Sequence, residues 1–369
     1  MDTKISINGY VIPESMTFSH STRMADSWRA APERVIQPEM NVGSAEINIK
    51  VFDGSTSQLG IARKTRNPLK LLHRRQTLDM TDCFIYDTRY EVDSNVGHYI
   101  ADTIPKLLAA KTSISAATGN EVDVYAILKE GSSRMSVEVF ENLGIPVVST
   151  EANVKGHIIK TSVVRPTTSI DGTICHANGP TMIGSLPDIY ASFRDKLLNK
   201  RTDRQEKVFL SRKSSRTIEN EDEITELLDG HGFKKYYFET GELSVIEQWE
   251  LISGAKQIIA IHGAGLSPLI YNLNGLLLPQ GNLSGLRIIE LYGAGYFVDF
   301  NRRLAAVMNA HWCGVRGRIS PEIVRDLDDR GGGRVHQFSS FRVDPESLKL
   351  ALDYSETVRS SEVFNGASN

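Results

Sequence analysis

The most constraining feature of this 369-residue sequence is an apolar segment that ends in a glycine-rich turn. Lys256 to Ile261 is typical of a buried central strand, and His262-Gly263-Ala264-Gly265 follows it and leads into a short helix predicted from Leu266. Backbone N–H groups at such a turn are unpaired, the helix dipole adds about half a positive charge, and glycine lets a phosphate approach closely. The pattern favours an anion site at a sheet edge, although a packing turn without a ligand has the same sequence.

Strands and helices alternate around this turn. Helices are predicted to begin at Asn220 and Ser244, where Glu223 and Glu247 complete capping boxes. Further strands are expected at 208–210, 233–238 and 287–291, with a helix at 298–308. This order predicts a compact Rossmann-like unit.

The first half of the chain gives a second set of alternating elements, which argues for a parallel sheet with helices on both faces. Strands are expected at 46–52, 83–86, 122–128, 146–148 and 158–164, and helices from 96 and at 132–143. We therefore divide the chain into an irregular N-terminal arm (1–45), an N-terminal Rossmann-like domain (46–185), a linker helix (186–206), a C-terminal Rossmann-like domain (207–340) and a terminal helix and tail (341–369).

Composition argues against several classes of protein, among them nucleic-acid-binding, zinc-binding, disulfide-rich and membrane-spanning proteins. The net charge of −3 indicates no broad basic face for nucleic acid. The cysteines Cys83, Cys175 and Cys313 are far apart and lack the spacing of a disulfide framework or a zinc site. The polar N-terminus and the lack of a long apolar stretch predict a cytoplasmic protein without a transmembrane segment, and leave peripheral membrane association open.

Two further features are expected on the same sheet edge as the glycine turn. Arg212 and Arg216 follow the strand at 208–210, where a guanidinium can bind phosphate oxygens, although a solvated polar loop is the alternative. Glu290 ends the strand at 287–291, where an acid can bind ribose hydroxyls or else serve as a surface acid or cap partner.

These residues resemble glycosyltransferase family 61. The resemblance rests on Leu210-Ser211-Arg212, Asn220-Glu221, Gly232-Phe233, Ser244-x-x-Glu247-Gln248, His262 to Leu266 and Ile289-Glu290-Leu291, in this order. Asn95-Val96-Gly97-His98, continuing to Asp102, matches the family's Asn-x-x-His-x-x-x-Asp segment. One departure is Ser267-Pro268, where many members have Thr-Asn.

The resemblance implies a GT-B fold of two facing Rossmann-like domains with parallel sheets. It implies an inverting, metal-independent glycosyltransferase that uses a nucleoside-diphosphate sugar, which we take as a UDP-sugar, and needs no other cofactor. The acceptor is expected to be a glycan or polysaccharide, and the lack of a targeting segment suggests a bacterial enzyme of capsule or surface-polysaccharide assembly. The donor-binding residues expected are Arg212, Arg216, His262, Gly263, Ala264, Gly265, Leu266 and Glu290.

One-step inversion requires a base for the acceptor hydroxyl. His98 and Asp102 are four residues apart and share a face if the segment is helical, so either Asp102 is the base or His98 is the base and Asp102 orients it. A structural pair is the alternative, and Glu247 is a weaker candidate base. Asn95 is assigned to acceptor binding or the interdomain region.

Two other classes of protein remain as alternatives at this stage. A nucleotide-sugar-binding protein would keep Arg212, the glycine turn and Glu290 without a working base. A polysaccharide pyruvyltransferase on a similar scaffold would need no nucleotide.

Overall fold

The computed structural model of the chain describes residues 1–7, 9–20, 32–59, 76–89, 96–164, 167–170, 173–176, 205–272, 285–296, 298–319, 321, 323, 326 and 336–365. It divides into two compact units, each described by itself below. Unit 1 comprises Met1–Gly9, Val42–Thr168 and Ile174–Lys196, and unit 2 comprises Tyr10–Asn41, Ser169–Thr173 and Leu197–Asn369. The linker helix predicted at 186–206 lies almost wholly outside the described residues.

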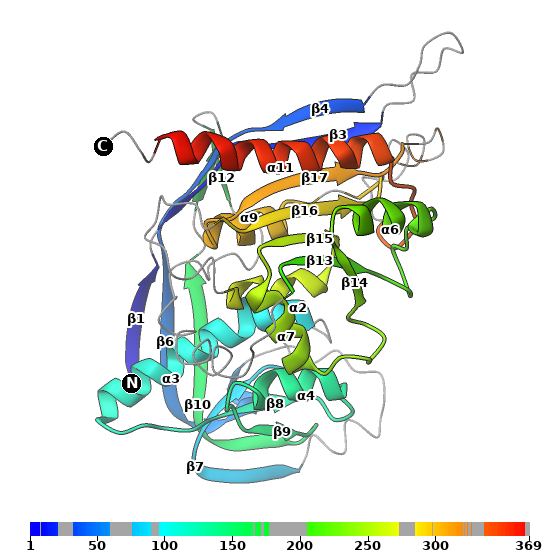
Figure 1. The fold of residues 1–369 in the computed structure, drawn as a ribbon. Coiled ribbons are helices and arrows are strands. Elements are labelled where there is room, and N and C mark those ends of the chain that lie inside the picture. Colours follow the sequence, from blue (N-terminus) through cyan, green and yellow to red (C-terminus); the bar gives the residue numbers. More distant parts are fainter. Residues whose placement is uncertain are drawn as a thin grey trace. The chain divides into compact units, whose positions relative to one another are not determined.

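Unit 1 is built on a six-stranded sheet with the order β1-β6-β10-β7-β8-β9 (Figure 1). Its strands are β1 (Asp2–Ile7), β6 (Ala45–Ser55), β7 (Thr77–Asp87), β8 (Val124–Leu128), β9 (Val147–Ser149) and β10 (Asn153–Val164). The neighbours from β10 to β9 pair in parallel, as expected from the alternating elements. The all-parallel prediction is wrong at the other side, because β6 pairs antiparallel with both β1 and β10.

The parallel part of this sheet is joined by helices, as the sequence predicts. One continuous helical stretch between β7 and β8 consists of α2 (Val96–His98), a π-helical segment η2 (Tyr99–Thr103) and α3 (Ile104–Thr118). The helix α4 (Arg134–Glu141) joins β8 to β9. Ser133 caps α4 by accepting a hydrogen bond from the amide of Ser136. Tyr99 packs edge-on against Phe140 at 5.4 Å, which ties the π-helical segment to α4.

Unit 2 contains a seven-stranded sheet with the order β14-β13-β15-β16-β17-β3-β4. Its strands are β3 (Ser15–His20), β4 (Pro32–Gln37), β13 (Lys207–Ser211), β14 (Lys234–Tyr237), β15 (Gln257–Ile261), β16 (Arg287–Tyr292) and β17 (His311–Arg316). All neighbours from β14 to β3 are parallel. The Rossmann-like alternation predicted for this half is therefore confirmed at the level of strands and parallel pairing.

Two strands of this sheet come from residues expected to form an irregular arm. β3 pairs in parallel with β17, and β4 closes the edge antiparallel to β3. The side chain of Phe18 is 1% exposed and joins the core of unit 2. The prolines and the short polar runs hide these strands in the sequence, and the parallel partner of β3, the strand β17, lies almost 300 residues away. The strand β17 was likewise not predicted.

The helices of unit 2 follow the sequence prediction with two corrections. They are α6 (Glu221–Gly230), α7 (Val245–Gly254), the 3-10 helix η4 (Ala264–Tyr271), α9 (Phe300–Val307) and α11 (Pro345–Asn365). The capping box of Ser244 and Glu247 is confirmed. The one expected at Asn220 is wrong, because the Asn220 amide bonds the backbone of Val343 instead of capping α6. The helix α11 also extends through most of the segment predicted as a tail.

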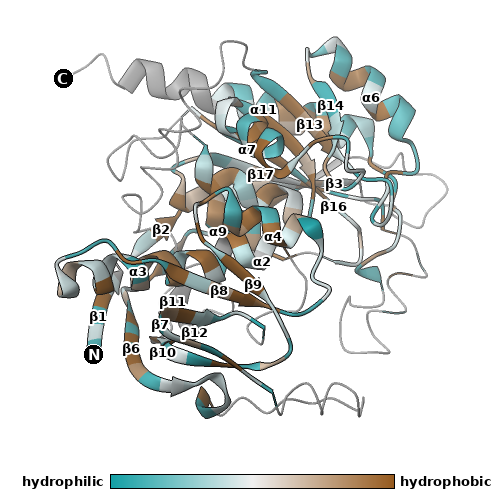
Figure 2. Ribbon diagram, turned by 90° about the horizontal axis from the view of Figure 1, so that it is seen from below, coloured by the Kyte–Doolittle hydropathy of each residue, from teal (hydrophilic) through white to brown (hydrophobic). Residues whose placement is uncertain are grey.

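Hydrophobic packing holds the sheet of unit 2 between these helices. β15 and β16 are buried at every residue, which accounts for the predominance of isoleucine and leucine in them. Ile224 and Leu228 of α6 and Leu348 of α11 pack into the same cluster as Ile259 and Ile289. Figure 2 shows hydrophobic residues along the strands and hydrophilic ones distributed on α6. Among the described helices, none is long and apolar enough to cross a membrane.

One smaller sheet and one short helix remain among the described elements. A four-stranded sheet has the order β12-β11-β5-β2. Its strands are β2 (Tyr10–Ile12), β5 (Met40–Val42), β11 (Thr167–Ile170) and β12 (Thr173–His176), and η1 (Thr56–Leu59) follows β6.

Candidate functional site

The strand order of unit 2 identifies where its sheet can bind a ligand. The order β14-β13-β15-β16-β17 puts β14 on one side of β13 and β15 on the other, so the direction in which successive strands are added to the sheet reverses between β13 and β15. Open parallel sheets bind ligands at such a switch point, at the carboxyl ends of the strands. Arg212 follows β13 and His262 follows β15, so the predicted residues stand at this point.

The structure brings both predicted arginines to the predicted glycine. A Cβ atom added to Gly263 would overlap Arg212 Nη1 and would lie 3.3 Å from Arg216 Nη1. Gly263 has φ 156° and ψ −172°, a region that glycine adopts with ease. A side chain at this position would therefore require Arg212 to shift its guanidinium group away from the turn. The turn is accessible, since Gly263 and Gly265 are half-buried and Ala264 is exposed.

Arg216 is fixed to the turn by hydrogen bonds. Its Nη1 donates to the carbonyl of His262 at 2.9 Å and its Nε donates to the carbonyl of Gln337 at 2.7 Å. Burial first, and then the positive charge of Arg212, lowers the pKa of Arg216 below its usual value. Two cations held this close together favour an anion between or beside them.

A carboxylate already uses the donors of the loop after β13. Glu239 accepts hydrogen bonds from the amides of Lys213 and Ser214 and from Ser214 Oγ, and its Oε2 lies 3.2 Å from Arg212 Nη2. Burial raises the pKa of Glu239, but these hydrogen bonds and the charge of Arg212 outweigh burial and lower it. Among the described residues, Arg212 Nε has no hydrogen-bond partner. The amides and Arg212 of this loop thus converge on one carboxylate, that of Glu239, which the sequence analysis did not single out.

Three of the residues predicted to bind the donor are buried, namely His262, which is 8% exposed, Leu266 and Glu290. Leu266 is completely buried, and its amide donates to the carbonyl of Gly263, so it packs beneath the turn. Glu290 is also 0% exposed, which removes its carboxylate from the sheet edge where ribose hydroxyls were expected. The helix expected after the turn is the 3-10 helix η4, with Pro268 inside it, rather than an α-helix.

Glu290 instead holds His262. Its Oε1 lies 2.6 Å from His262 Nδ1 and accepts from Asn301 Nδ2 at 2.6 Å. Its Oε2 accepts from the hydroxyl of Tyr292 at 2.5 Å and from Trp312 Nε1 at 2.9 Å. Burial and the neighbouring carboxylate hold the pKa of Tyr292 well above its usual range, so its hydroxyl stays a donor. Asn301 and Trp312 lie on elements that carried no sequence signal for a site.

The residues predicted to supply the base belong to unit 1. His98 ends α2, whereas Asn95 lies outside the described residues. Asp102 is in the π-helical segment, where its Oδ2 pairs with Lys106 Nζ at 3.4 Å and its side chain is 29% exposed. Pro105 follows at once and cannot donate a helix hydrogen bond, so a wider turn before it relieves the clash. The helical conformation expected for this segment is confirmed.

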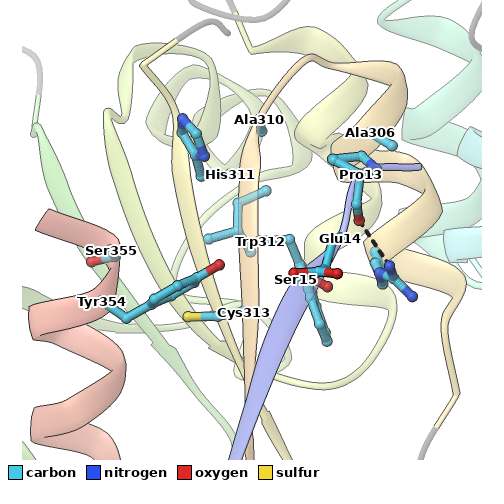
Figure 3. A pocket seen from close by; sticks show the side chains of 12 residues that line it. Pro13, Glu14, Ser15, Ala306, Ala310, His311, Trp312, Cys313, Tyr354 and Ser355 are labelled. Carbon is cyan, nitrogen blue, oxygen red and sulfur yellow. Dashed lines mark hydrogen bonds between the residues drawn. The ribbon is translucent and has the colours of Figure 1, made fainter. Parts of the chain in front are cut away.

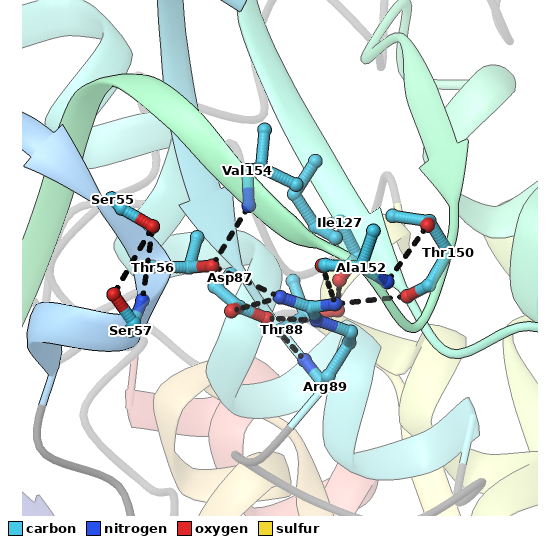
Figure 4. Close-up of polar contacts among 10 residues, drawn as sticks. All are labelled: Ser55, Thr56, Ser57, Asp87, Thr88, Arg89, Ile127, Thr150, Ala152 and Val154. Atoms are coloured by element: carbon cyan, nitrogen blue, oxygen red, sulfur yellow. Dashed lines mark hydrogen bonds and ion pairs between the residues drawn. The ribbon is translucent and has the colours of Figure 1, made fainter. Parts of the chain in front are cut away.

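The strand that leads to this segment is held by a buried ion pair. Asp87 and Arg89 have side chains that are 0% exposed, and Arg89 Nη2 lies 2.7 Å from Asp87 Oδ2. Arg89 also donates to Asp87 Oδ1 and to the carbonyls of Thr150 and Ala152 (Figure 4). The guanidinium therefore connects the end of β7 with the segment between β9 and β10.

Two cavities of unit 2 lie at opposite edges of its sheet, and only one of them shares the edge of the Gly263 turn. One of about 190 Å³ lies at the amino ends of β16 and β17, where Trp312, Tyr354 and Glu14 face it, and no predicted site residue lines it (Figure 3). The other, of about 490 Å³, is lined by Gly293 and Gly295 at the carboxyl end of β16 and by His336 and Ser339. The second cavity is thus on the sheet edge that carries Gly263.

A comparison with protein families matches residues 96–278 to the family Glycosyltransferase 61. The matched segment begins two residues before His98 and includes the turn at Gly263. The chain carries a glycosyltransferase family 61 domain. It is therefore a glycosyltransferase, which acts on a sugar donor and an acceptor. No curated protein matches the chain.

Proposed function

We propose that this glycosyltransferase binds the diphosphate of a nucleotide sugar, taken as a UDP-sugar, at the corner formed by Arg212, Arg216 and Gly263. The observation that carries the proposal is the convergence of both guanidinium groups on a glycine at the switch point of the sheet. A diphosphate suits this corner because it offers several negatively charged oxygens to two cations and to backbone amides. The neighbouring cavity of about 490 Å³ is the space that we assign to the nucleoside.

The proposed reaction is a single displacement with inversion in a GT-B arrangement. The acceptor hydroxyl oxygen forms a bond to the anomeric carbon while the bond from that carbon to the phosphate oxygen breaks. The electron pair of the broken bond stays on the diphosphate, where Arg212 and Arg216 would stabilise it without a metal ion. The hydroxyl proton passes to the base, for which Asp102 and His98 remain the candidates.

The acceptor proposed is a glycan or polysaccharide of a bacterial capsule or surface polymer, assembled in the cytoplasm. Support for this part is the family resemblance alone. The decisive experiment measures nucleotide release from UDP-, GDP- and CMP-sugars, with and without simple glycan acceptors. Acceptor-dependent release of UDP supports the proposal, whereas release of another nucleotide alone contradicts the donor assignment.

Arg212→Ala is expected to weaken UDP binding by roughly 1.5–3 kcal/mol, the range for a hydrogen bond to a charged group. Isothermal titration calorimetry with UDP measures this change. Arg134→Ala is a matched control, because Arg134 is 92% exposed on α4 and pairs only across the helix surface with Glu138. Equal affinities of Arg212→Ala and the wild type would remove Arg212 from the site.

Asp102→Asn and His98→Ala separate chemistry from donor binding. The variant that removes the base is expected to lower kcat about 10²- to 10⁴-fold and to leave UDP affinity unchanged. Steady-state kinetics and UDP titration of the same preparations measure both quantities, with Lys111→Gln on α3 as a control of the same helical stretch. Normal turnover in both variants contradicts the assignment of the base to this segment.

A further inference from the structure

The Glu290 carboxylate accepts hydrogen bonds from several side chains in addition to its contact with His262. Three uncharged donors, from Asn301, Tyr292 and Trp312, accompany His262. They come from α9, β16 and β17, so three separate elements fix the position of the two carboxylate oxygens. A carboxylate oxygen accepts hydrogen bonds, so a carboxylate at Glu290 assigns the proton of this contact to His262 Nδ1.

The ring of His262 is held by packing as well as by this bond. It stacks on Tyr292 with 5.1 Å between ring centroids and 18° between planes, and it meets Tyr296 edge-on at 5.6 Å. The carbonyl of the same residue accepts from Arg216, which belongs to the proposed diphosphate corner. The ring plane and the backbone of His262 are therefore constrained, and Nε2 is the ring nitrogen that we assign to a ligand.

We propose that Glu290, supported by Asn301 and Trp312, is a positioning residue that keeps His262 in the Nδ1–H tautomer, so that Nε2 accepts a hydrogen bond from a hydroxyl or N–H group of the bound nucleotide. The proposal rests on the proposed function, since it assigns His262 to the ligand of that site. It also explains why an acid at the end of β16 is buried rather than exposed. Glu290 acts on the ligand only through His262.

A double-mutant cycle tests this relation, because two residues that act through one contact are not additive. UDP affinity is measured by calorimetry for the wild type, His262→Ala, Glu290→Gln and the double variant. Each single variant is expected to weaken UDP binding about ten-fold, the loss of one hydrogen bond, and the double variant to be no weaker than His262→Ala. A further ten-fold loss from Glu290→Gln in the His262→Ala background overturns the proposal.

Nitrogen-15 NMR of the histidine side chains provides a readout that does not depend on ligand binding. The wild type is expected to show His262 as the Nδ1–H form, and Glu290→Gln to shift it toward a mixture of tautomers. Trp312→Phe, which keeps an aromatic ring but removes one donor to Oε2, is a milder variant expected to shift the signal in the same direction.

An unchanged His262 tautomer in both variants overturns the proposal. If the wild type binds neither UDP, GDP nor CMP, the proposed function fails. The tautomer result still decides whether Glu290 positions His262, so the two failures are distinguishable.

Discussion

Gly263→Val is expected to abolish measurable nucleotide binding while the protein stays folded. A branched side chain would occupy the position of Arg212 Nη1 and crowd Arg216 Nη1, so both guanidinium groups would have to move. Losing two charge-assisted contacts corresponds to roughly 3–6 kcal/mol, or about 10²- to 10⁴-fold in affinity. Calorimetry with UDP measures the affinity, and circular dichroism melting measures the fold.

A matched glycine separates the binding effect from backbone strain. Gly285 also has a positive φ, of 71°, and no atom lies within 4 Å of an added Cβ. Gly285→Val should therefore lower stability by about 1–3 kcal/mol, as a strained backbone does, and leave UDP affinity unchanged. Gly263→Ala should fall between the wild type and Gly263→Val. Wild-type affinity in a folded Gly263→Val protein would show that this turn does not hold the phosphates.

The second large effect is expected from Arg89→Met, which should destabilise the protein by about 3–5 kcal/mol. The substitution leaves the Asp87 carboxylate buried without its cation and leaves the carbonyls of Thr150 and Ala152 without a donor. Urea unfolding followed by circular dichroism measures the free energy of unfolding. The loss should appear in the transition that reports unit 1.

The double variant Asp87→Asn/Arg89→Met provides the critical comparison. Removing both charges is much less costly than removing one partner of a buried pair, so the double variant should be more stable than Arg89→Met alone. Arg89→Lys keeps the charge but loses the planar fork that reaches Asp87 and both carbonyls, and an intermediate loss is expected. A double variant that is less stable than Arg89→Met contradicts the description of this pair as a coupled unit.

Local patterns predicted the elements that carry the site. The apolar sequence of β15 and the glycines after it predicted a strand and a turn, because a central parallel strand is buried on both faces and a tight approach needs glycine. The capping box at Ser244 was predictable because both of its hydrogen bonds are made within four residues. Arg212 and Arg216 could be placed on the same sheet edge because strands of a parallel sheet share one carboxyl end.

Long-range pairing decided what the sequence could not. β3 joins a sheet whose strands β13 to β17 begin at residue 207, so its parallel partner β17 is invisible in any local window, and β4 enters the sheet only through β3. The contacts of Glu239 and Glu290 are likewise long-range and cannot be predicted locally. An acidic residue at the end of a strand looks the same in the sequence whether its side chain faces solvent or the interior. Only the packing of α9 and β17 shows that Glu290 is buried.

The sequence by itself thus determined the alternating α/β elements and the position of the glycine turn and the two arginines on one sheet edge, because these follow from periodicity, backbone freedom and strand polarity. The tertiary structure alone decided that Arg212 and Arg216 meet at Gly263, that Glu239 binds the loop between them, and that Glu290 supports His262. These are contacts between residues far apart in the chain, and their geometry exists only once the sheet is assembled.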